Sequence, residues 1–194
     1  MFGAMLDANV LVPSLLRDVL LTLGAGGMYE PLWSPVILEE TERAIRSLHH
    51  AKGRDADATD LYVAHLFSEM QRNFPDANIV GWEHLEGTYG LPDPDDEHVV
   101  AAAAHAKAGV IVTENLRDFP EGKLPGELHA LSGADFLDAT IEVNPAHAAS
   151  EMELLASRRG LTLGDLLDVL TMRVGRVPAF ALLQPYVDMS ARSE

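Results

Sequence analysis

Cysteine is absent from this sequence of 194 residues. Its absence excludes disulfide bonds and cysteine-based zinc sites. Basic residues are scarce, with 14 Lys and Arg against 30 Asp and Glu, which gives a formal net charge of −16. A general nucleic-acid binder usually carries a basic surface, and this composition does not provide one. The charge fits either an acidic soluble protein or carboxylates gathered around a metal ion, and only the positions of the acids separate the two.

Long apolar runs are also missing. No stretch is long enough to span a membrane, and the first residues, MFGAMLDANVLV, have no basic region, so we expect neither a membrane span nor a secretory signal. A cytoplasmic location fits the lack of cysteine. The length suits one full domain with or without a small appendage.

Short apolar segments alternate with helical ones along most of the chain. We predict strands at 1–6, 28–34, 77–82, 110–113 and 128–132, and helices at 10–27, 35–52, 55–74, 96–108 and 134–141. The run VIVT at 110–113 is typical of a strand buried on both faces of a parallel sheet. The alternation predicts an α/β fold with a largely parallel sheet.

The pattern changes near residue 142, after which no strand-like run appears. Three helices are expected at 144–159, 161–174 and 177–189. Asn144-Pro145 and Thr162, with Asp165 three residues later, are helix-start signals. We therefore expect an α/β domain over 1–141 and an all-helical extension over 142–194 that packs on it.

Helix-boundary residues give more local expectations. Ser34, followed by proline, should cap the helix that starts at Pro35. Asn9 is the better-placed cap for the first helix, which leaves Asp7 at the strand end without a structural role. Asp95 should cap the helix over 96–108, and Gly109 should end it.

Acidic residues gather where ligands of parallel sheets usually bind, beyond the carboxyl ends of the strands. Asp7 follows the first strand, and Asn115 and Asp118 follow VIVT, where a simple turn before Phe119-Pro120 is the alternative role. Glu40 should point along the edge of the core, since it lies three residues after Ile37 on a helix.

The segment LPDPDDEHVVAAA contains more acids than one helix start requires. Like charges raise each other's pKa values unless a cation neutralises them. Oxygen ligands without cysteine select Mg²⁺ or Mn²⁺, and such sites mostly act on phosphoryl groups. His98 and His105 are too sparse for a zinc site, so we expect them to be packing residues.

Four motifs in order, LDANVL, SPVILEE, LPDPDDEHVVAAA and GVIVTENLRDFP, resemble the PIN domain over about the first 140 residues. More narrowly, the chain looks like the VapC-type toxins of bacterial type II toxin–antitoxin pairs. The resemblance implies a three-layer α/β/α fold with a central, mainly parallel sheet. The last 50 or so residues look like a C-terminal helical extension found on some members.

The resemblance also implies a Mg²⁺-dependent endoribonuclease, with Mn²⁺ as an alternative ion. A metal-activated water would attack the RNA phosphodiester and leave a 5′-phosphate and a 3′-hydroxyl. The implied catalytic residues are Asp7, Glu40, Asp96 and Asp118, of which Asp7, Asp96 and Asp118 hold the metal; Asn9, Asp93, Thr113 and Asn115 support them. Whether Asp118 or Asn115 is the fourth member of the acidic set stays open. Glu97 stands where relatives often carry a basic residue, and we expect it, with Asp93, to hold outer-shell waters.

An RNase must attract a polyanion. We expect RNA contacts from Arg43, Arg46 and Arg117, although Arg43 could instead pair with Glu40 one turn away. The implied partners are the RNA and a small DNA-binding antitoxin, whose basic side chain could enter the carboxylate pocket. Relatives commonly dimerise, so a homodimer is also expected. The alternative functions are a PIN-type nuclease in RNA processing or on structured DNA, and a non-catalytic scaffold that binds RNA or protein.

Overall fold

The computed structural model describes residues 2–190, and Met1 and residues 191–194 lie outside the described part. A four-stranded sheet with the order β2-β1-β3-β4 forms its centre. The strands are β1 (Gly3–Leu6), β2 (Glu30–Leu32), β3 (Val110–Val112) and β4 (His129–Leu131), and every pairing is parallel. Met5 of the central strand β1 is in register with Leu32 on one side and Ile111 on the other.

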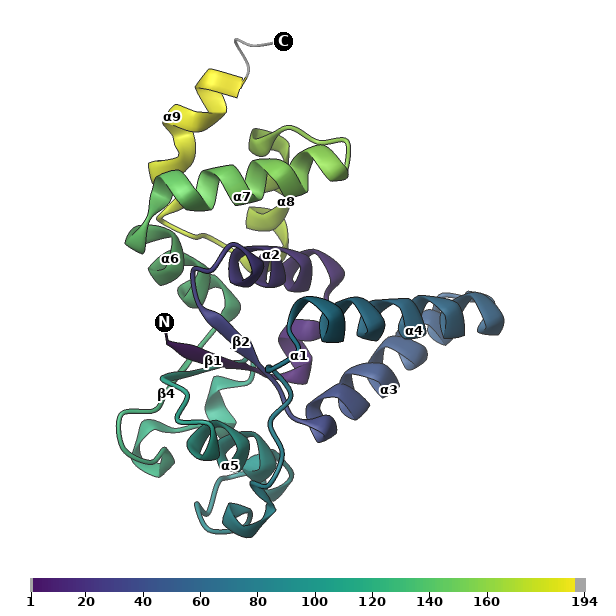
Figure 1. Cartoon of the computed structure of the whole chain (residues 1–194), viewed down its shortest axis with the longest axis vertical. Helices are drawn as coiled ribbons and strands as arrows, with labels where there is room; N and C mark the ends of the chain where they lie inside the picture. The colour runs from purple at the N-terminus through teal and green to yellow at the C-terminus, as the bar shows by residue number, and fades with distance from the viewer. Residues whose placement is uncertain (1, 191–194) are drawn as a thin grey trace.

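Helices cover both faces of this sheet (Figure 1). Helix α5 (Glu97–His105) packs against β1 and β3, while α2 (Ser14–Ala25) and α6 (Gly133–Val143) lie on the other side and contact β2 and β4. The predicted three-layer α/β/α architecture with a parallel sheet is therefore confirmed. Ala101, Ala102 and Ala103 of α5 are fully buried, and their small side chains let the helix lie close to the sheet.

The first predicted helix is two helices. Pro13, which has an extended backbone, separates α1 (Ala8–Leu11) from α2, because proline cannot continue the hydrogen-bond ladder of a helix interior. Helix α1 contacts α3 (Pro35–Ala51), whose N-terminal turn is capped by the Ser34 hydroxyl as predicted. Helix α4 (Ala56–Asn73) returns along α3, and the two project from the body of the molecule (Figure 1).

The strand predicted at 77–82 and the predicted end of the helix over 96–108 are wrong. Residues 77–82 form only a bridge between Trp33 and Asn78, since the chain turns away at Gly81, where φ is +86°. Helix α5 ends at His105, and Lys107 takes the left-handed conformation expected of Gly109. Residues 2–190 also contain four short 3-10 helices that were not predicted: η1 (Glu83–Leu85), η2 (Pro94–Asp96), η3 (Leu116–Asp118) and η4 (Glu121–Lys123).

The three predicted C-terminal helices are present as α7 (Pro145–Arg158), α8 (Leu163–Val174) and α9 (Phe180–Ser190). Asn144 caps α7, and Thr162 forms the expected capping box. Helices α7 and α8 contact α2, and Arg159 bonds Asp18 of that helix. Over residues 2–190, no helix is both long enough and apolar enough to cross a membrane.

Candidate functional site

Asp7 lies at the carboxyl end of the central strand and is 5% exposed. Its Oδ1 accepts the backbone N–H of Ala8 at 2.7 Å, so Asp7 caps α1. The prediction that Asn9 caps this helix is wrong, because Asn9 lies inside α1. Asn9 instead donates from Nδ2 to Asp7 Oδ2 at 2.7 Å and to Thr113 Oγ1 at 2.9 Å.

Thr113 joins the ends of β1 and β3. Its hydroxyl donates to Asp7 Oδ2 at 2.7 Å and accepts the backbone N–H of Asn115 at 3.1 Å. Burial raises the pKa of Asp7, and the hydrogen bonds from Thr113 and Ala8 oppose this rise only in part. The charge of Glu40 raises the pKa further. The predicted supporting residues Asn9 and Thr113 thus both contact the Asp7 carboxylate.

A second group of carboxylates lies beside Asp7. Asp93, Asp96 and Asp118 each offer an oxygen, and these oxygens all lie within 4.8 Å of one another. Asn115 donates to Asp118 Oδ2, so the two candidates for the fourth position are hydrogen-bonded to each other. The predicted metal ligands are Asp7, Asp96 and Asp118, whereas the group with oxygens within 4.8 Å contains Asp93 in place of Asp7.

Asp93 also has a local structural role. Its Oδ1 accepts the backbone N–H of Asp95 at 3.0 Å, and Asp93 is thereby the cap of η2. The prediction that Asp95 is the cap of the following helix is wrong, because the chain first makes a turn of 3-10 helix before α5 begins. Asp95 is exposed.

Asp96 connects this group to Asp7. Burial raises the pKa of Asp96 to about 6, and the charges of Asp7, Asp93 and Asp118 contribute in that order. Within the described residues, Asp96 Oδ2 is buried and has no hydrogen-bond partner. A buried, unpaired carboxylate oxygen surrounded by like charges fits a cation, and an all-oxygen donor set fits a hard divalent ion.

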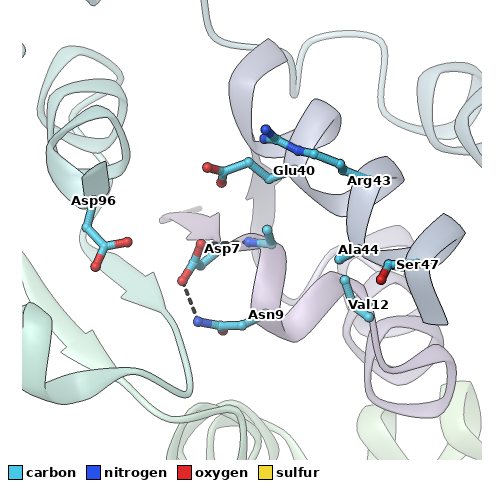
Figure 2. Close-up of a pocket in the computed structure, with 9 residues that line it drawn as sticks. Asp7, Asn9, Val12, Glu40, Arg43, Ala44, Ser47 and Asp96 are labelled. Carbon is cyan, nitrogen blue, oxygen red and sulfur yellow. Dashed lines mark hydrogen bonds between the residues drawn. The ribbon is translucent and has the colours of Figure 1, made fainter. Parts of the chain in front are cut away.

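An open pocket of about 490 Å³ adjoins these acids (Figure 2). Asp96 faces Asp7 and Glu40 across it, so acids from three separate elements converge on one space. The predicted position of Glu40 along the edge of the core agrees with this arrangement. The remaining lining residues come from α1, from the residue that directly follows it and from α3: Ala8, Asn9, Val12, Arg43, Ala44 and Ser47.

His98 is a site residue that the sequence reasoning treated only as packing. It is 4% exposed, and its Nε2 lies 3.4 Å from Glu40 Oε1. Neither ring nitrogen has a hydrogen-bond partner in the described part of the chain. The sequence feature that could have identified His98 as a site residue is its position on a largely apolar helix, where a buried histidine needs a polar neighbour.

Glu97, predicted to hold outer-shell waters, is bonded to the backbone of a neighbouring loop. It is 3% exposed, and its two oxygens accept the backbone N–H groups of Tyr89 and Leu91, each at 3.0 Å. Burial acts to raise the pKa of Glu97, but the N–H groups of Leu91, Tyr89 and neighbouring glycines outweigh it, and the pKa is lowered. The carboxylate therefore stabilises the loop before η2 by accepting hydrogen bonds from its backbone.

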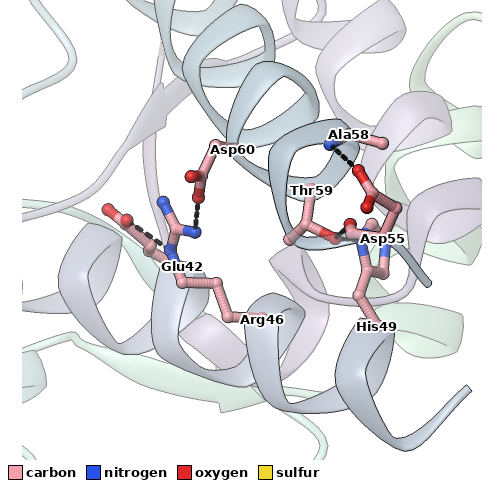
Figure 3. Close-up of polar contacts among 7 residues, drawn as sticks. All are labelled: Glu42, Arg46, His49, Asp55, Ala58, Thr59 and Asp60. Carbon is pink, nitrogen blue, oxygen red and sulfur yellow. Dashed lines mark hydrogen bonds and ion pairs between the residues drawn. The ribbon is translucent and has the colours of Figure 1, made fainter. Parts of the chain in front are cut away.

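The three predicted RNA-contact arginines differ in their surroundings. Arg43 lines the pocket and makes no ion pair or hydrogen bond with the described residues, so its alternative pairing with Glu40 is not observed. Arg46 is bonded to Glu42 and Asp60, which ties α3 to α4 (Figure 3). Arg117 is exposed in η3, next to Asp118.

Comparison with known proteins places these observations in a family. The chain matched no curated protein and no solved structure. Residues 3–117, more than half of the chain, match the family model described as PIN domain. This match covers β1 to the start of η3 and therefore most of the elements that carry the acids. PIN domains are generally metal-dependent nucleases, and this chain belongs to the PIN domain family.

Proposed function

We propose that this chain is a divalent-metal-dependent endoribonuclease and the toxin of a VapC-type toxin–antitoxin pair. The observation that carries the proposal is the convergence of Asp93, Asp96 and Asp118 beside a pocket that Asp7 and Glu40 also line. An inert scaffold would gain nothing from this many unpaired acids in one place, because they destabilise each other unless a cation is present.

Asp96 and Asp118 belong to both the predicted ligand set and the observed cluster, so we assign them as direct metal ligands. Asp7, hydrogen-bonded to Asn9 and Thr113, keeps its carboxylate beside Asp96. A Mg²⁺ or Mn²⁺ ion held by Asp96 and Asp118 would supply Lewis-acid activation of the phosphodiester and charge stabilisation of the leaving oxygen. We assign to Glu40, which lines the pocket across from Asp96, the role of accepting a proton from the attacking water.

The chain has few basic residues, so the negatively charged RNA backbone needs local cations near the site. Arg43 supplies one, since its guanidinium lines the pocket and has no carboxylate partner in the described residues. Arg117 offers a second exposed guanidinium beside the acids. Two local cations would position a phosphate without making the whole surface attractive to nucleic acid, and binding should weaken with salt.

The net charge of −16 also supports a basic protein partner. An Arg or Lys side chain of a cognate antitoxin would satisfy the unpaired Asp96 oxygen in place of the metal. Association would then be fast at low salt and salt-sensitive. Tight binding that is unchanged at high salt would contradict this part of the proposal.

The test is cleavage of total cellular RNA by the purified, antitoxin-free protein with Mg²⁺, followed by sequencing of the RNA ends. We expect defined sites with 5′-phosphate and 3′-hydroxyl ends, and growth inhibition on expression. Asp96→Asn should abolish both, whereas Glu39→Gln, an exposed acid on α3, should abolish neither. Cleavage without growth inhibition would favour RNA processing, and absence of cleavage under all metals would overturn the nuclease assignment.

A further inference from the structure

The segment before the acid cluster has little backbone support of its own. Between Gly87 and Pro92, the structure contains no regular element and no backbone–backbone hydrogen bond among the described residues. Gly87 and Gly90 have φ of +75° and +64°, values that lie outside the backbone conformations of right-handed helices and strands. Asp93 follows directly and carries one of the three clustered carboxylates.

One side chain compensates for this lack. Glu97 accepts the N–H of Tyr89 at Oε2 and that of Leu91 at Oε1, so a single carboxylate spans the segment. Leu91 is buried in the core, and its N–H group would otherwise lack a partner. The two acceptor oxygens of an ionised carboxylate suit two converging N–H donors, and such bonds are stronger than neutral ones.

Glu97 is also the first residue of α5 and directly follows Asp96. The same side chain therefore joins the segment that ends at Asp93 to the residue next to Asp96. We propose that Glu97 is a positioning residue for the acid cluster, which holds Asp93 beside Asp96 by binding the backbone of Tyr89 and Leu91. This inference rests on the proposed function, because it assigns the cluster to a metal ion.

The test measures Mn²⁺ binding to the full chain by calorimetry. Glu97→Gln keeps the size of the side chain but replaces one acceptor oxygen by an NH₂ group, which opposes an N–H. We expect about 10-fold weaker Mn²⁺ binding, in the range typical for residues that orient metal ligands. Glu86→Gln is the matched control, since it removes the same charge from an exposed position beside the segment and should leave binding unchanged.

A double-mutant cycle separates positioning from general damage. If Glu97 acts through Asp93, Glu97→Gln should weaken Mn²⁺ binding by less than about 2-fold in an Asp93→Asn background. Glu97→Asp, which keeps the charge but is too short to reach both N–H groups, should behave like Glu97→Gln and replaces it if that variant does not fold. Wild-type affinity in both variants, or the same loss with and without Asp93, would overturn the proposal.

Amide hydrogen exchange gives a second readout that needs no metal. The N–H groups of Tyr89 and Leu91 should be protected in the wild-type protein and exchange faster in Glu97→Gln, while amides of β1 stay unchanged. If the wild-type protein binds no Mn²⁺, the proposed function fails at that step. Unchanged exchange at Tyr89 and Leu91 would instead overturn the role of Glu97 alone.

Discussion

The hydroxyl of Thr113 donates a hydrogen bond of 2.7 Å to Oδ2 of Asp7, across 106 positions of the chain. Both residues are buried at the carboxyl ends of neighbouring strands. Thr113→Val keeps the shape of the side chain but removes the donor. We expect a loss of about 1–2 kcal/mol in the free energy of unfolding and about 10-fold weaker Mn²⁺ binding, measured by denaturation and calorimetry.

Thr113→Ser serves as the control, because it keeps the hydroxyl and loses only a methyl group. Metal affinity close to that of the wild type is expected for this variant. If Thr113→Ser weakened Mn²⁺ binding as much as Thr113→Val, packing rather than the hydrogen bond to Asp7 would explain the effect.

The raised pKa of Asp96 makes stability depend on pH when no metal is bound. The folded pKa of about 6 lies above the usual 3.8, so the folded chain binds this proton more tightly than the unfolded chain. Its contribution to stability is complete below 3.8 and is lost as pH rises through 6. Asp96→Asn should therefore stabilise the metal-free protein by about 1 kcal/mol at pH 7 and flatten the profile between about pH 4 and 6. Urea denaturation in EDTA measures this, and an unchanged slope in the variant would contradict it.

A bound metal ion should offset the loss of folding stability that the ionised Asp96 causes. A cation that binds only the folded state stabilises it by about 2.7 kcal/mol at 100 times its Kd. We expect the melting temperature to rise with Mn²⁺ or Mg²⁺ concentration and to return to its starting value with EDTA. The rise should be lost in Asp118→Asn. A variant of the exposed Asp95, which lies outside the observed cluster, should respond like the wild type.

Two arginines on α3 provide a matched pair for testing the RNA path. Arg43→Ala should raise the KM for RNA by about 10-fold, because a guanidinium facing the pocket is lost, and should leave stability within about 0.5 kcal/mol. Arg46→Ala breaks exposed ion pairs with Glu42 and Asp60 and should change KM less. Equal effects of the two substitutions on KM would contradict a specific role of Arg43 and would show that RNA binding depends only on net charge.

The C-terminal helices should contribute to the stability of the whole chain. Met152 of α7 is fully buried, and α7 packs against α2. Met152→Ala should destabilise the chain by about 2–5 kcal/mol in a single cooperative transition, followed by circular dichroism. Leu154→Ala, on an exposed position of the same helix, is the control. Two separate transitions would instead support the predicted division into residues 1–141 and 142–194.

The parallel sheet and most positions of the acids follow from local sequence patterns. Apolar runs identify β1 and β3, and polar residues directly after them, such as Asp7 and Thr113, must meet at one edge. Residues 77–82 show the limit of this reasoning. Their apolar pattern is that of a strand, but in the structure this segment pairs with its neighbour only at the bridge between Trp33 and Asn78. The extent of pairing depends on that tertiary contact and not on the local pattern.

The individual roles of neighbouring acids could not be predicted for a similar reason. Asp96 and Glu97 are adjacent and chemically alike, yet one faces the cluster and the other binds the backbone of Tyr89 and Leu91. That difference depends on the turn of 3-10 helix before α5 and on where a distant loop lies. The short distance between His98 and Glu40 likewise depends on how α3 and α5 pack, and residue spacing within either helix does not predict it.

The strand order has a consequence for protein synthesis. The central strand β1 is made first, but one of its two neighbours, β3, is made more than a hundred residues later. A nascent chain that has not yet reached Thr113 and Asp118 lacks one of the hydrogen-bond donors to Asp7 and part of the acid cluster. The acid cluster can therefore form only after most of the protein has been made, and the proposed nuclease activity would begin no earlier.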